Sequence, residues 1–459
     1  MSSISSLGVG SNLELSSLLA QLSTAEKQPL VAMDARAASY TTKLSAYGTL
    51  QSAVATLQTA SAKLADLSLF QEVKAASSFT TVLTASAGTT AAAGSYAINV
   101  SQLAQAQSLA AAGQADATDV IGSGTINFDF ASGVSTNVAV GADSTLEGIR
   151  DAINAKKDAG VTASIVNDGS GTPFRLVLVS SKTGEASSMA ISVTDGTGML
   201  GTLMNHDPLG ASTMTETVAA KNAELTVNGL AISSATNTVA ESMQGVTLTL
   251  VKPGESTLTV ARDTASVSSA INAMVASYNS FLSTGAKLTG YDADTQKGSA
   301  LTGDSTLRNL QVSLRSALTS PQGGATGDFT MLSNIGVSFQ KDGTLEVDST
   351  KLEAALSTNL DGVAKLFSGS ATDTVGYGKQ LSALALGFTA TGGALKAAAD
   401  GLTSSIKQMD KQYDAMELRI DATVERYRKQ FTQLDIMMSS MNSTTSYLTA
   451  QFDAMNSSK

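Results

Sequence analysis

The sequence predicts an α+β multidomain protein in which long N- and C-terminal helices form a coiled-coil-like helical domain that carries two inserted β-rich domains. Three observations predict it. An apolar stripe at helical spacing runs through residues 402–452, a second runs through residues 30–64, and between them the period of apolar residues falls to two. Neither long helix can bury its stripe alone, so each is the expected partner of the other.

The C-terminal stripe consists of two rows of apolar residues, spaced three and four positions apart, that no Gly or Pro interrupts. A helix over residues 402–452 would be about 75 Å long. We expect residues 402–420 to pack against residues 44–64, and residues 424–452 to be mobile until a partner covers them. The expected assembly or chaperone interface of this stripe is Ile406, Tyr413, Ile420, Tyr427, Phe431, Leu434, Met438, Met441 and Leu448.

The N-terminal stripe follows a first short helix, which Asn12 is expected to cap. Pro29 interrupts or restarts the helix there, because proline is tolerated best in a first turn. The stripe residues are Leu30, Met33, Tyr40, Leu44, Tyr47, Val54 and Leu57.

The chain is expected to divide into four parts. Residues 1–40 and 420–459 are terminal assembly segments, mobile or helical and leg-like; residues 41–78 and 265–419 form the helical domain; residues 79–111 and 213–264 form an antiparallel β domain; and residues 112–212 form an inserted α+β domain.

Turn signals support the β domains. Asn228-Gly229 between apolar runs predicts a hairpin, because both turn residues tolerate positive φ. The alternating runs 246–250 and 258–260 flank Pro253-Gly254, which suggests an antiparallel meander that pairs with residues 79–104. In the inserted domain, a capping box at Ser144–Glu147 predicts a helix over about 145–158, followed by strands 161–166, 174–180 and 189–193.

Helical spacing returns at residues 267–282, and Asp304 is expected to cap the next helix. A hairpin is expected around the turn 341–344, and a capping box at Thr350–Glu353 predicts a further helix.

Composition excludes several classes of function. The net charge of −10 without a Lys/Arg-rich run argues against nucleic-acid binding. The absence of cysteine rules out disulfides, and no apolar run is long enough to span a membrane. The N-terminus lacks the basic and apolar regions of a secretory signal peptide.

The motifs that could carry chemistry are weak. Residues 196–201 match the glycine spacing of a dinucleotide site, but no long helix follows, so we interpret them as a glycine-rich loop. Residues 292–296 begin like a calcium loop, but Lys297 replaces the required glycine. His206, the only histidine, is expected at the surface without a catalytic task. We therefore expect no enzyme, no catalytic residues, no cofactor and no metal.

Two further features of the last helix have open interpretations. Asp421, Glu425, Arg426, Arg428 and Lys429 are typical of a solvated helix face, although they could steer partners. The cluster Met437, Met438 and Met441 could be either core or an adaptable binding surface.

Both ends of the chain resemble the bacterial flagellar filament cap proteins, the hook-associated protein 2 family. The resemblance lies in residues 4–13 (ISSLGVGSNL), 47–50, 426–435 (RYRKQFTQLD), 437–439 and 446–449. Residues 96–100, 146–166 and 341–352 are also similar to segments of caps or flagellins.

The resemblance implies a structural cap at the distal tip of the flagellar filament. Copies of the chain, commonly five, would form a plate that retains exported flagellin and promotes its folding and polymerisation, as filament elongation and motility require. Other implied partners are the hook–filament junction proteins and an export chaperone on the C-terminal helix. The protein would be extracellular, exported by the flagellar type III system without a cleaved signal peptide.

Two alternatives remain open from the sequence. One is another flagellar axial protein, a flagellin or a junction protein, since these share helical ends. The other is a cell-surface adhesin or an enzyme with a coiled-coil stalk. Some caps also bind host surfaces, so the sequence leaves cell adhesion open as an additional role.

Overall fold

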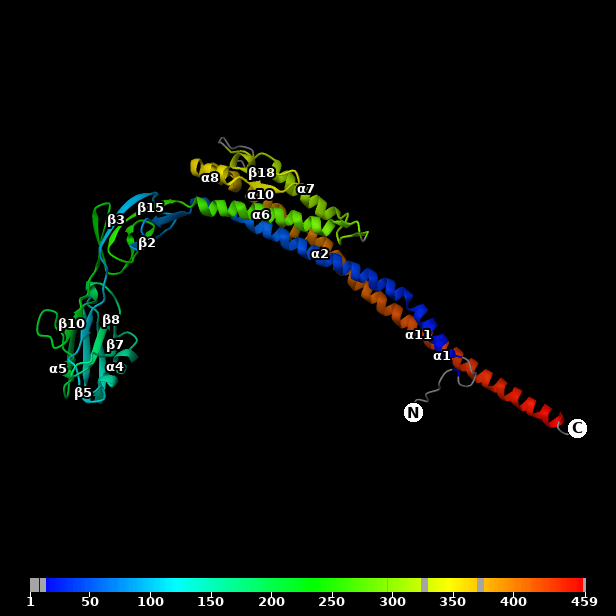
Figure 1. The fold of residues 1–459 in the computed structure, drawn as a ribbon, viewed down its shortest axis with the longest axis horizontal. Helices are drawn as coiled ribbons and strands as arrows, with labels where there is room; N and C mark the ends of the chain where they lie inside the picture. Colours follow the sequence, from blue (N-terminus) through cyan, green and yellow to red (C-terminus); the bar gives the residue numbers. More distant parts are fainter. Residues whose placement is uncertain (1–7, 9–13, 295, 323–328, 370–374, 457–459) are drawn as a thin grey trace. The chain divides into compact units, whose positions relative to one another are not determined.

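The computed structural model describes residue 8 and residues 14–294, 296–322, 329–369 and 375–456 (Figure 1). The chain forms two compact units: Met1–Leu69 together with Thr264–Lys459, and Phe70–Asp263. The first is mainly helical and the second is mainly β-sheet, which confirms the predicted fold class.

Two long helices dominate the helical unit. Helix α1 spans Leu15–Glu26 and α2 spans Gln28–Ala65, with Pro29 in the first turn of α2, as predicted. The last helix, α11, spans Ala394–Asn456; its 63 residues give a length of about 95 Å. Asn12, the expected cap of α1, lies outside the described residues.

The core of this unit forms around the second half of α2. Leu50, Val54, Leu57 and Leu64 recur at helical spacing and are fully buried. They face α6 (Thr264–Thr289) and α10 (Tyr377–Thr389), both of which pack along α2. The predicted packing of residues 402–420 on 44–64 is therefore wrong in register, because α6 and α10 already occupy that part of α2.

The shorter elements of the helical unit are α7 (Ser305–Thr319), α8 (Ser349–Thr358), α9 (Leu360–Ser368), and the hairpins β16–β17 (Tyr291–Asp292, Lys297–Gly298) and β18–β19 (Val337–Phe339, Leu345–Val347). The short helix α3 (Ser68–Gln71) contains the point in the chain where the helical unit ends and the β-rich unit begins. Asp304 caps α7 by accepting a hydrogen bond from the Leu307 amide at 2.9 Å, as predicted. Helix α8 is capped by Asp348 instead of the predicted Thr350, since the Asp348 carboxylate accepts from the Lys351 amide.

The β-rich unit contains two hydrophobic cores. Around the first, a five-stranded sheet has the order β1-β15-β3-β11-β12 and a three-stranded sheet has the order β13-β14-β2. The strands are β1 Val73–Ser77, β2 Leu83–Ala87, β3 Gly94–Gln102, β11 Ala223–Val227, β12 Leu230–Ser234, β13 Thr238–Met243, β14 Val246–Leu250 and β15 Gly254–Arg262. The β11–β12 hairpin turns at Asn228 and Gly229, with φ values of 48° and 83°, as predicted.

The predicted pairing of residues 79–104 with 213–264 is confirmed, because β3 pairs with β11 and β15, and β2 pairs with β14. The predicted meander, in which the runs 246–250 and 258–260 are neighbouring antiparallel strands, is wrong. Strands β14 and β15 belong to different sheets and do not pair with each other. The alternation of apolar and polar residues in these strands predicted which residues face the core, but it did not predict which strand lies beside each of them.

The second core lies between the sheets β10-β4-β8-β7 and β6-β5-β9, with α4 packed against them. The elements are β4 Ser108–Ala110, β5 Val120–Phe130, β6 Ser135–Thr145, α4 Leu146–Ala155, β7 Val161–Asn167, β8 Phe174–Ser180, β9 Met189–Thr194, α5 Leu200–Leu203 and β10 Thr215–Val218. Strands β4 and β10 lie just outside the expected range 112–212, yet they pair within this α+β body. Helix α4 is capped by Thr145, one residue after the predicted Ser144.

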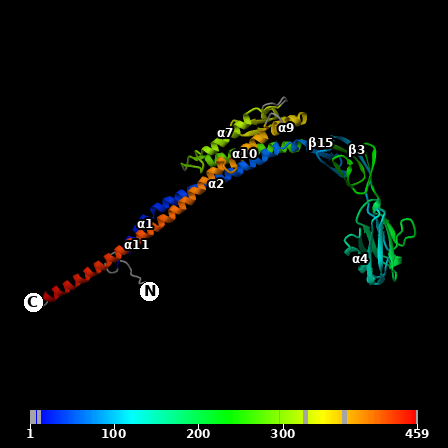
Figure 2. The same ribbon diagram turned by 180° about the vertical axis from the view of Figure 1, so that it is seen from behind.

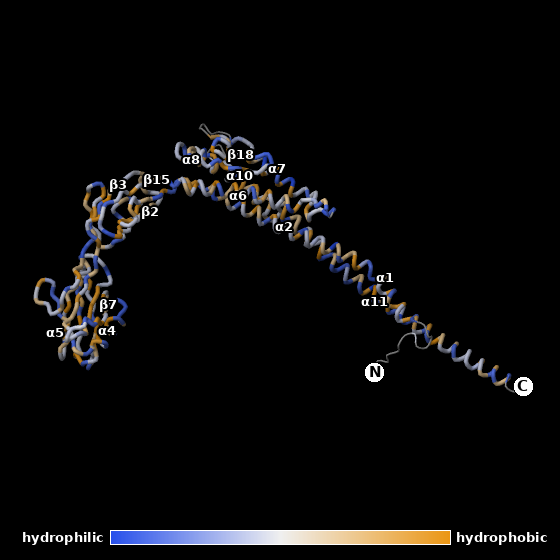
Figure 3. The backbone as a smooth tube through the Cα atoms, in the orientation of Figure 1, coloured by the Kyte–Doolittle hydropathy of each residue, from blue (hydrophilic) through white to orange (hydrophobic). Residues whose placement is uncertain are grey.

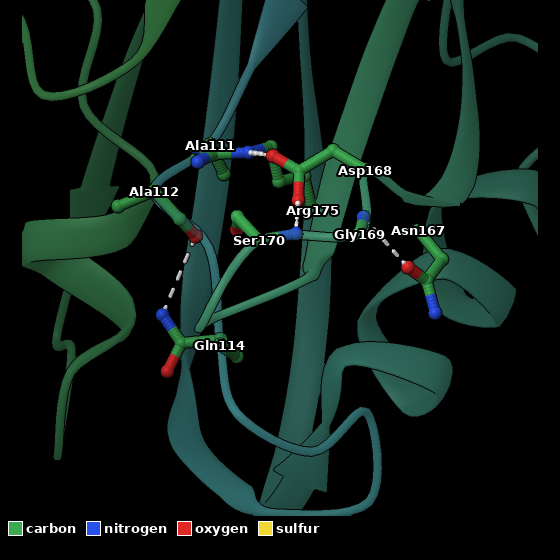
Figure 4. A network of polar contacts seen from close by, with 8 residues as sticks. All are labelled: Ala111, Ala112, Gln114, Asn167, Asp168, Gly169, Ser170 and Arg175. Carbon is green, nitrogen blue, oxygen red and sulfur yellow. Dashed lines mark hydrogen bonds and ion pairs between the residues drawn. The ribbon is translucent and has the colours of Figure 1, made fainter.

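An ion pair fixes the turn between β7 and β8 (Figure 4). The Asp168 carboxylate accepts from the Arg175 side chain and from the Ser170 amide. These donors hold the pKa of Asp168 well below its usual range, with the Arg175 hydrogen bond the main cause. The network closes the loop between the strands predicted at residues 161–166 and 174–180.

The expectation of a surface histidine is wrong. His206 is only 7% exposed, and its backbone pairs with Ile191 of β9 in both directions. The polar neighbours of His206 in sequence suggested a solvated loop, but its main chain extends the edge of the β9 sheet and carries the ring inward.

Candidate assembly interface on the terminal helices

The terminal helices lie side by side and antiparallel (Figures 1 and 2). Met33 and Ala37 of α2 line a cleft with Met409 and Tyr413 of α11, and Tyr427 reaches back to Glu26 of α1. The partner of residues 409–427 is therefore the N-terminal part of the chain, from α1 to the first turns of α2. The pairing between the two ends is as predicted, although its register differs.

Burial of the predicted stripe residues on α11 falls towards the C-terminus. Ile420 is 3% exposed. Ile406, Tyr413, Tyr427, Phe431 and Met438 are half-buried. Leu434 is 38%, Leu448 49% and Met441 57% exposed. The first part of the stripe is thus largely buried by other parts of the chain, and the last part is not.

The N-terminal stripe is more completely buried within the chain. Leu30, Tyr47, Val54 and Leu57 are buried, and Met33, Tyr40 and Leu44 are half-buried. Tyr47 donates a hydrogen bond to the Asp304 carboxylate at 2.5 Å, which ties α2 to the cap of α7. These residues belong to the interior of the helical unit and offer little surface for an outside partner.

A surface of large apolar side chains remains exposed on the last turns of α11. We call it the distal apolar surface; it consists of Leu434, Ile436, Met437, Met441, Tyr447, Leu448, Phe452 and Met455. In both views α11 continues past the described start of α1, and Figure 3 shows hydrophobic positions recurring along this part. Exposed apolar patches of this kind are typical of interaction sites.

Ile436 and Tyr447 were missed because they lie off the two heptad rows, and Met455 was missed because it continues the first row beyond residue 452, where the predicted stripe ended. The signal that could have found Ile436 is the contiguous run Ile436-Met437-Met438, which no helix can place on a single narrow stripe. The surface is therefore broader than a two-helix seam.

Charges around the helix pair are mostly solvated. The cleft at Met409 carries Asp34, Asp410 and Asp414, and the pKa of Tyr413 is raised, chiefly by the negative charge of Asp34. Arg428 and Glu425 form an exposed ion pair at 2.9 Å, as expected of a solvated face. Such pairs contribute at most about 1 kcal/mol.

The described part of the chain offers no grouping of His, Asp and Glu side chains that could hold a metal ion, and none of its helices could cross a membrane. The glycine-rich segment 196–201 runs into the four-residue helix α5 and hydrogen-bonds to the backbone of β5 through Thr197 and Met199. Asp292 is the last residue of strand β16, and its carboxylate accepts from the Asp294 amide.

The fold defines a multidomain protein whose terminal helices pair with each other and whose β-rich unit is inserted between them in the sequence. Family models for the N-terminus and C-terminus of flagellar hook-associated protein 2 match residues 11–107 and 220–443, and a flagellin hook IN motif matches residues 121–183. The chain belongs to the flagellar hook-associated protein 2 family, the flagellar cap proteins.

Relatives match over the full length. The chain is 41% identical to flagellar hook-associated protein 2 of Escherichia coli K12 over 476 aligned positions that cover 100% of both. It is 34% identical to the A-type flagellar hook-associated protein 2 of Pseudomonas aeruginosa, over 95% of each. The crystal structure of the D1-D2-D3 domains of the Escherichia coli flagellar cap protein is similar, with 38% identity, a TM-score of 0.62 and coverage of 78% of this chain and 99% of that one.

Proposed function

We propose that this chain caps the distal tip of the bacterial flagellar filament, where an oligomeric cap retains exported flagellin and promotes its folding and polymerisation. Membership of the cap protein family supports the location. The observation that carries the mechanism is the distal apolar surface, because the described chain leaves it uncovered.

Burial of this surface would supply the free energy of assembly. Burying a large apolar side chain contributes about 1.5–3 kcal/mol. The eight side chains of the distal apolar surface are 38–66% exposed, so burial of the area that each still exposes contributes roughly half of that amount. Several partners are proposed to use the surface in turn: an export chaperone before secretion, then other copies of the chain, commonly five in this family, and flagellin or the hook–filament junction proteins at the tip.

The proposed route out of the cell is the flagellar type III system, which would deliver the chain to the extracellular tip. Passage through a narrow channel suits a protein without disulfides. It also favours a chaperone on the distal apolar surface, since exposed apolar helices aggregate in the cytoplasm.

Deletion of residues 1–40 and 420–459 tests the proposal in a cap-deficient strain. The deletion removes α1 and the distal apolar surface but leaves Leu50, Val54 and Leu57 packed against α6 and α10. We expect a folded, secreted protein that does not restore filaments, with flagellin lost to the medium. Normal filament growth would refute the proposal, and the full chain serves as the positive control.

A further inference from the structure

His206 is an interior group that the proposed function does not use. Its ring nitrogens Nδ1 and Nε2 are both shielded from solvent, and within the described chain neither has a hydrogen-bond partner. Leu203 and Met204, which precede it in the chain, and Met214, whose amide bonds to the Asn205 carbonyl, are members of the α+β core. A neutral imidazole is tolerated there, but a charged one has no compensating bond.

The charged groups that act on His206 are Asp207, beside it in the chain, and Glu216 of β10. Both are exposed and hence screened by water. Both are also engaged elsewhere: Asp207 Oδ1 accepts from the Leu209 amide, and Glu216 Oε1 accepts from the side chain of the buried Gln107 at 2.7 Å. Burial therefore outweighs their attraction, and it lowers the pKa of His206.

The segment that contains His206 is held to the α+β body mainly by contacts at sheet edges. Residues 205–214 form a closed loop in which the Met214 and Thr213 amides donate to the Asn205 carbonyl. Strand β10 then pairs only with the three-residue strand β4. His206 and Ile191 exchange backbone hydrogen bonds of 3.0 and 2.7 Å, which fasten the start of this segment to β9.

We propose that His206 is an acid-sensitive latch: protonation of its ring releases residues 205–218 from the α+β body. This inference is independent of the proposed capping function. A histidine whose pKa is lower in the folded state stabilises that state fully above its ordinary pKa of about 6.5, and the stabilisation is lost as the pH falls below that value. The other core of the β-rich unit contains no histidine and serves as an internal reference.

The full-length chain provides a direct test because its single histidine gives one Hε1 signal in an NMR titration. We expect that signal to titrate below pH 6.5. Hydrogen exchange of the Ile191 and His206 amides, compared with that of amides in β3 and β15, should show an opening equilibrium that rises about five- to tenfold between pH 7.5 and pH 5.5.

Two variants complete the test. His206→Gln and His206→Phe both keep an uncharged side chain, so the acid-dependent opening should disappear in each, and Phe also preserves apolar packing if Gln does not fold. A ring that titrates at or above pH 6.5 would overturn the proposal. So would the same acid-dependent opening in the wild type and in a folded variant.

Discussion

The hydroxyl of Tyr427 on α11 donates a hydrogen bond to the carboxylate of Glu26 at the end of α1, at 3.3 Å. The contact joins residues 401 positions apart and brings the first helix onto the last. The buried residues of α11, Leu395, Met409 and Ile420, all precede this point, and apart from Leu418 its exposed large apolar side chains follow it. The contact thus marks where internal packing gives way to the proposed assembly surface.

Substitution of Tyr427 should loosen α1 without unfolding the unit. Tyr427→Asp places a carboxylate next to Glu26, so we expect faster hydrogen exchange throughout α1. Tyr427→Phe keeps the ring and loses one hydrogen bond, worth about 1 kcal/mol, and it is the matched control. Equal exchange in α1 for both variants and the wild type would show that the contact has no role in holding α1.

Gly378 should be essential for the packing of α10 on α2. A Cβ at this position would lie 2.7 Å from the Ala65 nitrogen and 2.8 Å from the Leu64 carbonyl carbon, which are backbone atoms. Gly378→Ala should therefore lower the free energy of unfolding by about 1–3 kcal/mol in urea denaturation.

Gly387, in the same helix, is the control for that substitution, because a Cβ there meets nothing within 4 Å. Gly387→Ala should leave stability unchanged or raise it by up to about 1 kcal/mol, as expected from helix propensity. Equal losses at both positions would contradict the close approach of α10 and α2.

The Tyr47–Asp304 contact should make the helical unit sensitive to alkali. Burial, followed by the hydrogen bond to Asp304, raises the pKa of Tyr47 from 10.0 to about 12. A raised pKa stabilises the folded state below pH 10 and loses that contribution as the pH rises from 10 towards 12. Tyr47→Phe should reduce the fall in unfolding free energy over this range. Tyr291→Phe, at a 63% exposed position, should behave like the wild type.

Local signals in the sequence predicted local structure well. Asp304 caps its helix and Asn228-Gly229 turns its hairpin because each acts on the few residues around it. The shifted caps at Thr145 and Asp348 show the limit of such signals: in each case a neighbouring Ser, Thr or Asp could also accept the hydrogen bond, and the strand that precedes the helix decides.

Long-range partners were less predictable. The α2 stripe is buried as expected, but its second half packs against α6 and α10 instead of α11, because these helices also have apolar faces. The burial of His206 had no signal in the sequence, because backbone pairing with Ile191 places the ring and no apolar pattern surrounds it. The distal apolar surface was partly predicted. Its residues on the heptad rows follow from their spacing, whereas Ile436 and Tyr447, which lie off the rows, do not.

The central claim is that the distal apolar surface is an assembly interface. Electron microscopy of filament tips in a cap-deficient strain tests it with the double variant Met441→Asp/Leu448→Asp, whose substituted residues are 57% and 49% exposed and so can be changed without disturbing the fold. Ser446→Asp, on the opposite side of the helix, is the control. We predict capped filaments of normal length with the control and no capped filaments with the double variant, although both are secreted. Normal capped filaments with the double variant would contradict the claim.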